Sequence, residues 1–157
     1  MDLENRLLLT DQTYYEKLVE IVICSGIGPN ILKKYKPALD KHFSDFFTAA
    51  GYTETDCFNI YRDESMLRNM GKIEACIYNA REIAMICGTY GSMEMYFSGF
   101  DTIEPQERLI KMSKDLMSRF KYLGEKNVVT FIKKIHAEHE AQSEALTDVL
   151  PLQDMVG

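Results

Sequence analysis

Lysines flank a glycine in one short segment of the chain, Lys121-Tyr122-Leu123-Gly124-Glu125-Lys126-Asn127. A glycine between two helical patterns predicts a tight corner, and the first backbone N–H groups of the second helix have no helical partner. Such a helix start binds phosphate, and Lys121 and Lys126 add positive charge beside it. The segment therefore favours binding to a nucleic-acid backbone. A plain structural corner is the alternative, and Glu125 would repel a phosphate.

Two earlier glycine turns supply further candidates. Gly26-Ile27-Gly28-Pro29-Asn30 breaks the helical pattern of residues 15–25 and predicts a tight loop. Lys72 follows Gly71 at the start of a long helix and is a further candidate phosphate contact. Tyr14 and Tyr15 would offer a ring to a pocket at the loop, although two tyrosines at a helix start are also typical of core packing.

Two other groups of reactive side chains are weighed against structural roles. His136 and His139, with Glu140 beside them, share a helical face, but the absence of a further ligand nearby favours a solvated face over a metal site. Cys24 stands next to Ser25 without a histidine close in sequence to activate it, and we assign it to the core. We therefore expect no metal and no cofactor.

The charge of the chain is unevenly distributed. The net charge is -6, which by itself argues against a nucleic-acid partner. Residues 108–134, however, contain eight basic and two acidic residues, so this stretch has a net charge of +6 and the rest of the chain a net charge of -12. Because local charge decides docking, this stretch supports a DNA-binding face, with a solvated helix face of mixed charge as the alternative.

The cysteines and the N-terminus indicate the compartment. The four cysteines have no C-x-x-C spacing and lie beside apolar residues, a pattern typical of buried thiols in a reducing compartment. The N-terminus is acidic, and the only apolar run near it is 7–9, so neither a signal peptide nor a membrane span is expected. A cytoplasmic protein without membrane contact is predicted.

Helical spacing dominates the chain. It predicts helices over residues 15–25, 31–47, 108–120 and from Val128 onward, and one after Gly71 that ends at Gly88 or Gly91. Thr55 or Asp56 would cap one short helix, and residues 63–65 another. Residues 93–100 have no strand to pair with and are predicted as helical or irregular. Residues 1–157 thus form one all-α domain of about eight helices, with a loose polar tail over 141–157.

Several segments, taken in order, resemble the 3-methyladenine DNA glycosylase I family, within the helix-hairpin-helix DNA glycosylases. Residues 16–26 and 31–34 are similar to the family's first core helix and the helix after its pocket loop. Residues 71–75 with 79–81 resemble its G-K-I-x-A…N-A-R helix. Residues 95–100 are similar to its aromatic element, and 119–124 to its G-F-K-F-V-G hairpin. The resemblance covers residues 15–135, the expected glycosylase-like core.

The resemblance implies that the enzyme flips an alkylated purine, chiefly 3-methyladenine, out of double-stranded DNA and hydrolyses its N-glycosidic bond. The residues expected to bind DNA are Lys72, Lys121, Tyr122, Leu123, Gly124, Lys126 and Asn127. The residues expected to form the substrate pocket are Tyr14, Tyr15, Ser25, Gly26, Ile27, Gly28 and Asn30.

The sequence departs from the family pattern at the pocket. Ser25 stands where the family has a glutamate, the loop is shorter, and the chain contains no tryptophan to stack on a base. No Cys or His precedes Cys24, so the family's zinc site is not expected. Lys126 is comparable to the nucleophilic lysine of related bifunctional glycosylases, with Glu144 and Asp148 in the range of their downstream aspartate. The catalytic residue thus stays unassigned.

Three functions are compatible with these patterns. The first is a monomeric, monofunctional DNA N-glycosylase for an alkylated purine. The second is a non-catalytic helix-hairpin-helix DNA-binding protein that has lost the pocket, which Ser25 and the missing tryptophan favour. The third is a helical protein-interaction domain without a role on DNA, which the acidic remainder of the chain allows.

Overall fold

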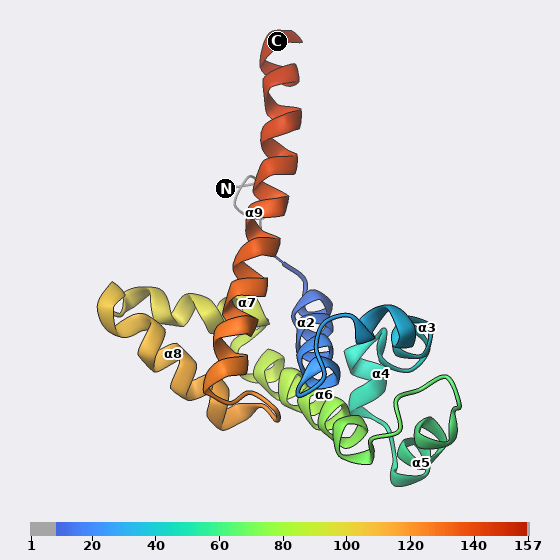
Figure 1. Cartoon of the computed structure of the whole chain (residues 1–157). Helices are drawn as coiled ribbons and strands as arrows, with labels where there is room; N and C mark the ends of the chain where they lie inside the picture. The colour runs from blue at the N-terminus through green and yellow to red at the C-terminus, as the bar shows by residue number, and fades with distance from the viewer. Residues whose placement is uncertain (1–8, 157) are drawn as a thin grey trace.

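Helix α2 (Asp11–Cys24) is the central element of the chain, and the other helices surround it (Figure 1). The computed structural model describes the backbone of residues 9–156 and the side chains of residues 9–145. Thr10 caps α2 by accepting a hydrogen bond from the amide of Thr13, which starts the helix four residues before the predicted position. Half of its residues are buried, because α2 packs against α3, α6 and α9 at once.

Three shorter helices, α3 (Ile31–Phe43), α4 (Phe46–Ala50) and α5 (Glu54–Arg62), lie on one side of α2 (Figure 1). The single helix predicted over 31–47 is wrong, because the carboxylate of Asp45 accepts from the amide of Phe47 and starts a new helix there. Thr53 and Asp56 form a capping box at the start of α5. The short helix predicted at 63–65 is absent, since Asp63 ends α5 and its carboxylate closes a turn on Ser65.

Helix α6 (Met70–Tyr90) passes beneath α2 and supplies much of the core. Asn69 caps it by accepting from the amide of Lys72, so Gly71 lies inside the first helical turn rather than in a turn before it. The inner face carries small and β-branched side chains, including the buried Ile73 and Ala80. The helix ends at Gly91, whose positive φ of 98° suits glycine, in agreement with one of the two predicted ends.

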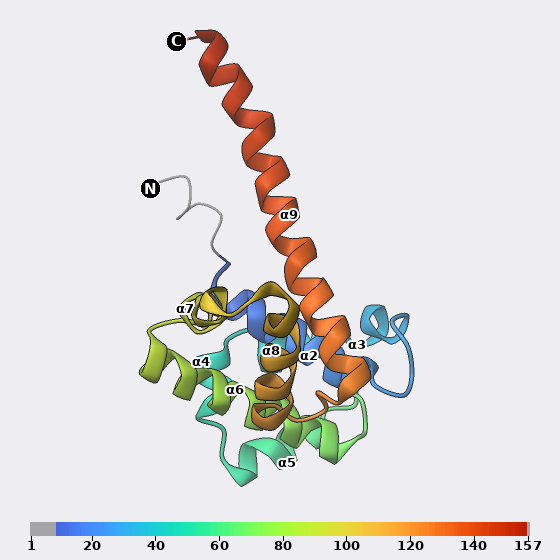
Figure 2. The same cartoon turned by 90° about the vertical axis from the view of Figure 1, so that its left-hand side faces the viewer.

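The remaining helices are α7 (Met93–Ser98), the 3₁₀ turn η1 (Gly99–Thr102), α8 (Pro105–Arg119) and α9 (Glu125–Val156). Figure 1 shows α7 and α8 on the opposite side of α9 from α3, α4 and α5. Figure 2 shows α9 rising well beyond the other helices. The backbone of the predicted polar tail continues α9 up to Val156.

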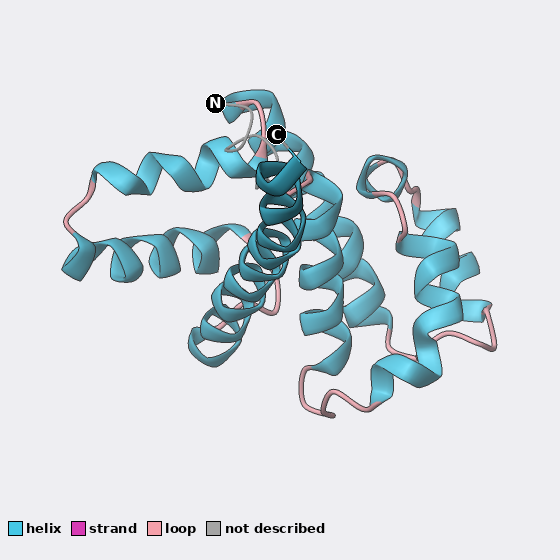
Figure 3. Ribbon diagram, turned by 90° about the horizontal axis from the view of Figure 1, so that it is seen from above, coloured by secondary structure: helices cyan, strands magenta, loops and turns pink. Residues whose placement is uncertain are grey.

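The described residues thus form an all-α domain with eight α-helices, as the sequence predicts, and Figure 3 shows helices and loops but no strand. Within residues 9–156, no helix is both long enough and apolar enough to cross a membrane.

Candidate functional site

The corner between α8 and α9 is exposed to solvent. Leu123 is buried and anchors it, whereas Lys121, Gly124 and Lys126 are exposed. The first hydrogen bond of α9 joins the amide of Val128 to the carbonyl of Gly124 at 2.8 Å. The amides of residues 125–127 precede that bond, so they have no partner within the helix and are free to bind an anion. Among the DNA-binding residues predicted here, Leu123 has its side chain in the core and offers only its backbone.

The corner is held on α6 by Asn79, a residue that the sequence reasoning did not single out. Its side chain is 0% exposed. Its Nδ2 donates to the carbonyl of Lys121 at 3.2 Å, and its Oδ1 accepts from the amide of Lys121 at 2.8 Å. A polar residue on the apolar face of a predicted helix is the signal that points to such a role. The clamp positions the corner relative to the core.

A second set of contacts ties the corner to the loop after α2. The Nδ2 atom of Asn127 donates to the carbonyl of Tyr122 at 2.8 Å and to Oγ of Ser25 at 3.3 Å. Tyr122 adopts a positive φ of 62°, which turns the chain sharply before α9. The predicted residues Ser25, Tyr122 and Asn127 therefore meet in the structure. Ser25 acts here as a link between the two segments.

Lys72, expected as a phosphate contact, lies elsewhere. It is 4% exposed, and its Nζ donates to the carbonyls of Ser25 and Ile23 at 2.7 and 2.8 Å. These are carbonyls at the end of α2 that lack helical partners, and the ammonium satisfies them. Burial lowers the pKa of Lys72. The expectation of a phosphate contact is thus corrected, because the side chain points into the protein and caps α2.

The loop of residues 26–30 presents one apolar side chain to solvent. Gly26 and Gly28 both have positive φ, 78° and 118°, in the region that glycine tolerates best. Ile27 between them is 55% exposed. Asn30 precedes α3 as an exposed residue and makes no side-chain capping bond. An exposed aliphatic side chain on a tight loop is the kind of wedge that DNA-bending proteins insert between bases.

Tyr14 and Tyr15, expected at the pocket, belong to the core. Both are 0% exposed, because they lie on the inner face of α2 rather than before it. The Tyr14 hydroxyl donates to Glu94 at 2.8 Å, and its ring stacks on Phe97 at 5.2 Å between centroids. The Tyr15 hydroxyl donates to the carbonyl of Cys76 at 2.9 Å. Burial raises the pKa of both tyrosines. This part of the predicted pocket is therefore wrong.

Glu20, Lys134 and Lys72 are charged residues close to the end of α2. Glu20 lies one helical turn before Cys24, and its carboxylate is 2.9 Å from Nζ of Lys134. Burial raises the pKa of the Cys24 thiol, in keeping with its assignment to the core. The ammonium of Lys72 lies 2.7 Å from the carbonyl of Ser25.

The other reactive groups are accounted for by structure. Lys126 and Glu144 lie on the same straight helix, 18 positions and roughly 27 Å apart, so they cannot act as a lysine–carboxylate pair. Asp148 lies outside the residues whose side chains are described. His136 pairs with Glu140, and His139 with Glu94. Among the described residues, no three His, Cys, Asp or Glu side chains gather as a metal site would require.

A cavity of about 790 Å³ opens beside the corner, between α5 and α6. Its lining combines aromatic rings, two carboxylates and two basic side chains. The lining residues are Tyr52, Thr53, Glu54, Cys57, Phe58, Met70, Gly71, Glu74, Ala75, Ile77, Tyr78, Arg81, Lys121 and Tyr122. We call it the α5–α6 groove. A smaller cavity, about 350 Å³, lies between α2 and α3.

An all-α domain with an exposed basic corner at a helix start, beside a cavity, is compatible with the architecture of a helix-hairpin-helix DNA-binding protein. The chain is similar in fold to solved structures of 3-methyladenine DNA glycosylase I. A variant in complex with 3-methyladenine matches with a TM-score of 0.67 at 21% identity, over 80% of this chain and 76% of that chain. The Staphylococcus aureus enzyme matches with the same TM-score at 20% identity, over the same shares.

The family model for methyladenine glycosylases matches residues 6–135. The chain therefore belongs to the methyladenine glycosylase family, as the ordered segments of its sequence predict. It is accordingly a DNA glycosylase for alkylated purines, and the two non-catalytic alternatives are not favoured.

Proposed function

We propose that the chain acts as a monomer on double-stranded DNA and excises 3-methyladenine or a similar alkylated purine through the residues described above. The observation that carries this proposal is the exposed start of α9, fixed by Asn79 on one side and linked by Asn127 to the loop after α2. Its four cysteines are free thiols, which suits the cytoplasm as the place of action.

The start of α9 grips one DNA strand without reading its sequence. Phosphate oxygens accept from the amides of residues 125–127, and Lys121 and Lys126 neutralise the phosphates on either side. Glu125 is exposed in the same turn, and it lowers the affinity unless its side chain turns to solvent. Weak, salt-dependent binding suits an enzyme that searches along DNA.

The loop of residues 26–30 opens the duplex at the gripped position. Since Asn127 bonds to both Ser25 and Tyr122, the loop and the corner move as one unit. Ile27 enters the stack where the damaged base leaves and replaces its stacking contacts. The Ile27 side chain thereby fills the space that the extruded base leaves in the stack, and the damaged base is hindered from returning.

The chemistry demands little from the protein, because alkylation places a positive charge on the purine. The N-glycosidic bond breaks with its electron pair going to the base, which leaves as a neutral molecule. Water adds to C1′ of the sugar and gives its extra proton to solvent, so the products are a free base and an abasic site. No Schiff base is formed, which agrees with the separation of Lys126 and Glu144 by 18 positions along α9.

Base release measures this function. Methylated duplex DNA is incubated with purified protein, and the free bases are separated and quantified. We expect 3-methyladenine to appear in proportion to enzyme, abasic sites to form in equal number, and the strands to stay intact until they are treated with base. Methylated DNA that yields no free purine at any enzyme concentration would refute the proposal.

A further inference from the structure

The α5–α6 groove is a cavity to which the proposed excision assigns no role. It begins at the corner between α8 and α9, because Lys121 and Tyr122 are among its lining residues. The Tyr122 hydroxyl lies close to the first turn of α6, 3.5 Å from the position that a Cβ on Gly71 would take. A volume of about 790 Å³ is sufficient for a small ligand or a short peptide segment. The charges and rings of the lining indicate which ligand would fit.

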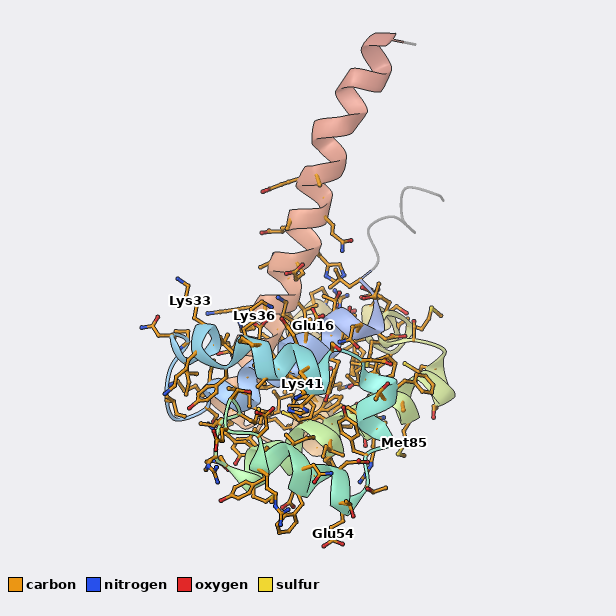
Figure 4. All side chains as sticks on the ribbon, turned by 90° about the vertical axis from the view of Figure 1, so that its right-hand side faces the viewer. Glu16, Lys33, Lys36, Lys41, Glu54 and Met85 are labelled. Carbon is orange, nitrogen blue, oxygen red and sulfur yellow. The ribbon has the colours of Figure 1, made fainter. Side chains whose placement is uncertain are left out.

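Two carboxylates of the groove are uncommitted. Glu54 on α5 and Glu74 on α6 are exposed, and neither forms an ion pair with a residue whose side chain is described. Burial raises the pKa of the Cys57 thiol, and the charges of Glu74 and Glu54 raise it further, so both carboxylates act on the same part of the groove. Figure 4 shows Glu54 at the lower end of the molecule. Arg81, which also lines the groove, is tied to two backbone carbonyls between α4 and α5.

The exposed rings of this region already hold cations of the protein itself. Tyr78 and Phe58 are 41% and 50% exposed. The Lys121 ammonium lies 4.9 Å from the centroid of the Tyr78 ring, and the guanidinium carbon of Arg62 lies 5.5 Å from that of Phe58. A cation over the face of an aromatic ring is attracted by the negative potential of that face. The groove therefore suits an ammonium or guanidinium group, and the two carboxylates strengthen the attraction.

The cation on Tyr78 has a second task in the proposed function. Lys121 neutralises a DNA phosphate beside the start of α9, and an ammonium that turns to a phosphate leaves the ring. Glu74 lies one helical turn before Tyr78 on the same face of α6, so the departure of Lys121 also removes a positive charge near this carboxylate. In the DNA-bound protein, the groove thus offers an open ring next to an unpaired carboxylate.

We propose that the α5–α6 groove is a docking site for an arginine- or lysine-bearing segment of a partner protein, whose cation replaces Lys121 on Tyr78 and faces Glu74. The preference for a cation is independent of the proposed function, whereas its coupling to DNA rests on that function. Since DNA draws Lys121 out of the groove, DNA favours the partner, and by linkage the partner raises the affinity for DNA by the same factor. A DNA strand is the poorer occupant, because its phosphates would meet two unpaired carboxylates.

Peptide binding to the free protein tests the preference for a cation. The probe is a capped tripeptide with arginine between two glycines, and the neutral comparison carries citrulline, which has nearly the same shape. We expect the arginine peptide to bind at least about threefold more tightly, with amide shifts in the α5 and α6 residues that line the groove. Glu74→Gln should remove this preference, and Glu16→Gln, at an exposed carboxylate on α2, should keep it. Equal binding of the two peptides, or an unchanged preference in Glu74→Gln, would overturn the assignment.

The exchange of one cation for another is tested at Lys121. Lys121→Met removes the ammonium from Tyr78 but keeps an unbranched side chain, so the arginine peptide should bind this variant about threefold more tightly than wild type. Lys126→Met is the matched control, because it removes the same charge from an exposed residue of the corner that does not line the groove. The gain should shrink when Tyr78→Leu is also present. Equal peptide affinities of wild type and Lys121→Met would reject the exchange.

Addition of DNA tests the coupling. With a saturating abasic-site duplex, the arginine peptide should bind wild-type protein about threefold more tightly than without it, once binding of the peptide to the duplex alone is subtracted. Unchanged affinity would reject the coupling, and weaker binding would show that DNA itself occupies the groove. If wild type released no 3-methyladenine, the proposed function would fail, and the two measurements on the free protein would still decide on the groove.

Discussion

The two sides of the first turn of α6 differ sharply. Lys72 points inward and closes the end of α2, whereas Glu74, two residues later, points outward into the α5–α6 groove. Side chains two residues apart on an α-helix point in directions about 200° apart, so Lys72 and Glu74 lie on opposite faces of α6. On the inward face, the buried side chains of Lys72 and Asn79 are hydrogen-bonded to backbone groups of other segments. The outward face is open and carries a carboxylate without an ion-pair partner among the described residues.

The two faces of α6 are expected to have different roles, the inward face in stability and the outward face in binding. On the inward face, Lys72 bonds to the loop after α2 and Asn79 to the corner before α9, and Asn127 of α9 links the two segments. On the outward face, Glu74 is exposed, and only Arg81 is tied to the fold, through the carbonyls of Ala50 and Tyr52. Substitutions on the inward face should therefore lower stability first, and those on the outward face should lower binding or excision without unfolding the protein.

The largest effect is expected at Asn79. Asn79→Ala removes both hydrogen bonds between the buried Asn79 side chain and the backbone of Lys121, which should cost about 2 kcal/mol of unfolding free energy. Urea denaturation measures the loss. Asn59→Ala, an exposed change on α5, should stay within roughly 0.5 kcal/mol of wild type. An equal loss in both variants would mean that the clamp is unimportant.

The next effect distinguishes the two roles considered for Lys72. Lys72→Met keeps the length of the side chain but removes two hydrogen bonds to α2 carbonyls, so unfolding free energy should fall by about 2 kcal/mol. DNA affinity of the folded fraction should be unchanged. Lys33→Met, which alters an exposed lysine on α3, provides the stability control. Normal stability together with weaker DNA binding would restore the phosphate role predicted from sequence.

The corner itself is tested by reversing its charge. The double variant Lys121→Glu, Lys126→Glu should bind an abasic-site duplex roughly tenfold or more weakly at moderate salt, and the slope of log affinity against log salt should fall by about 2. Fluorescence anisotropy at several salt concentrations gives both quantities. Lys111→Glu, a single exposed change on α8 that is paired only with Glu107, should alter them much less. If the double variant binds like wild type, the DNA lies on another face.

A smaller effect is expected from the wedge. Ile27→Ala shortens an exposed side chain, so stability should change by less than about 0.5 kcal/mol. Base release should slow by roughly threefold to tenfold, because the extruded base is less well prevented from returning. The control substrate is a duplex with a mismatch at the lesion. Because a mismatched base leaves the stack more easily, the variant should release the base from this duplex at nearly the wild-type rate. The same defect on both duplexes would assign Ile27 a different role.

The smallest effect is expected at Ser25. Ser25→Ala loses one hydrogen bond of 3.3 Å from Asn127, which should lower unfolding free energy by about 0.5–1 kcal/mol. The excision rate should stay within about threefold of wild type, because the Ser25 hydroxyl carries no charge that could stabilise a cationic base. A loss of several orders of magnitude would show that Ser25 is in the catalytic pocket.

The sequence predicts the scaffold better than the site. The ends of helices at glycine, such as Gly91, and the corner at Gly124 follow from local backbone preferences and are found as expected. The buried positions of Lys72 and Tyr14 could not be predicted from local backbone preferences. Helical spacing does not tell whether a polar side chain in the first turn of a helix contacts solvent or the end of another helix. That depends on how closely α2 approaches α6 and α7, which is set by the packing of the whole domain.

The α5–α6 groove is a second feature beyond reach of the sequence. Its walls come from residues 52–58, 70–81 and 121–122, and only the tertiary fold brings these together. Glu74 stands inside a segment that is recognisable by its resemblance to the family, yet the pattern gives no reason to single it out. Asn79 was visible as a polar residue in an apolar stripe, but its partner 42 positions away was not.

Hydrogen–deuterium exchange with and without an abasic-site duplex tests most directly whether the corner holds DNA. The amides of residues 125–127 lack helical partners and should exchange rapidly in the free protein. On addition of DNA, we predict strong protection of a peptide spanning 120–128 and moderate protection of one spanning 25–30, with little change in α3 or the middle of α8. Unaltered exchange at 120–128 under saturating DNA, with protection elsewhere, would contradict the assignment of this corner as the DNA grip.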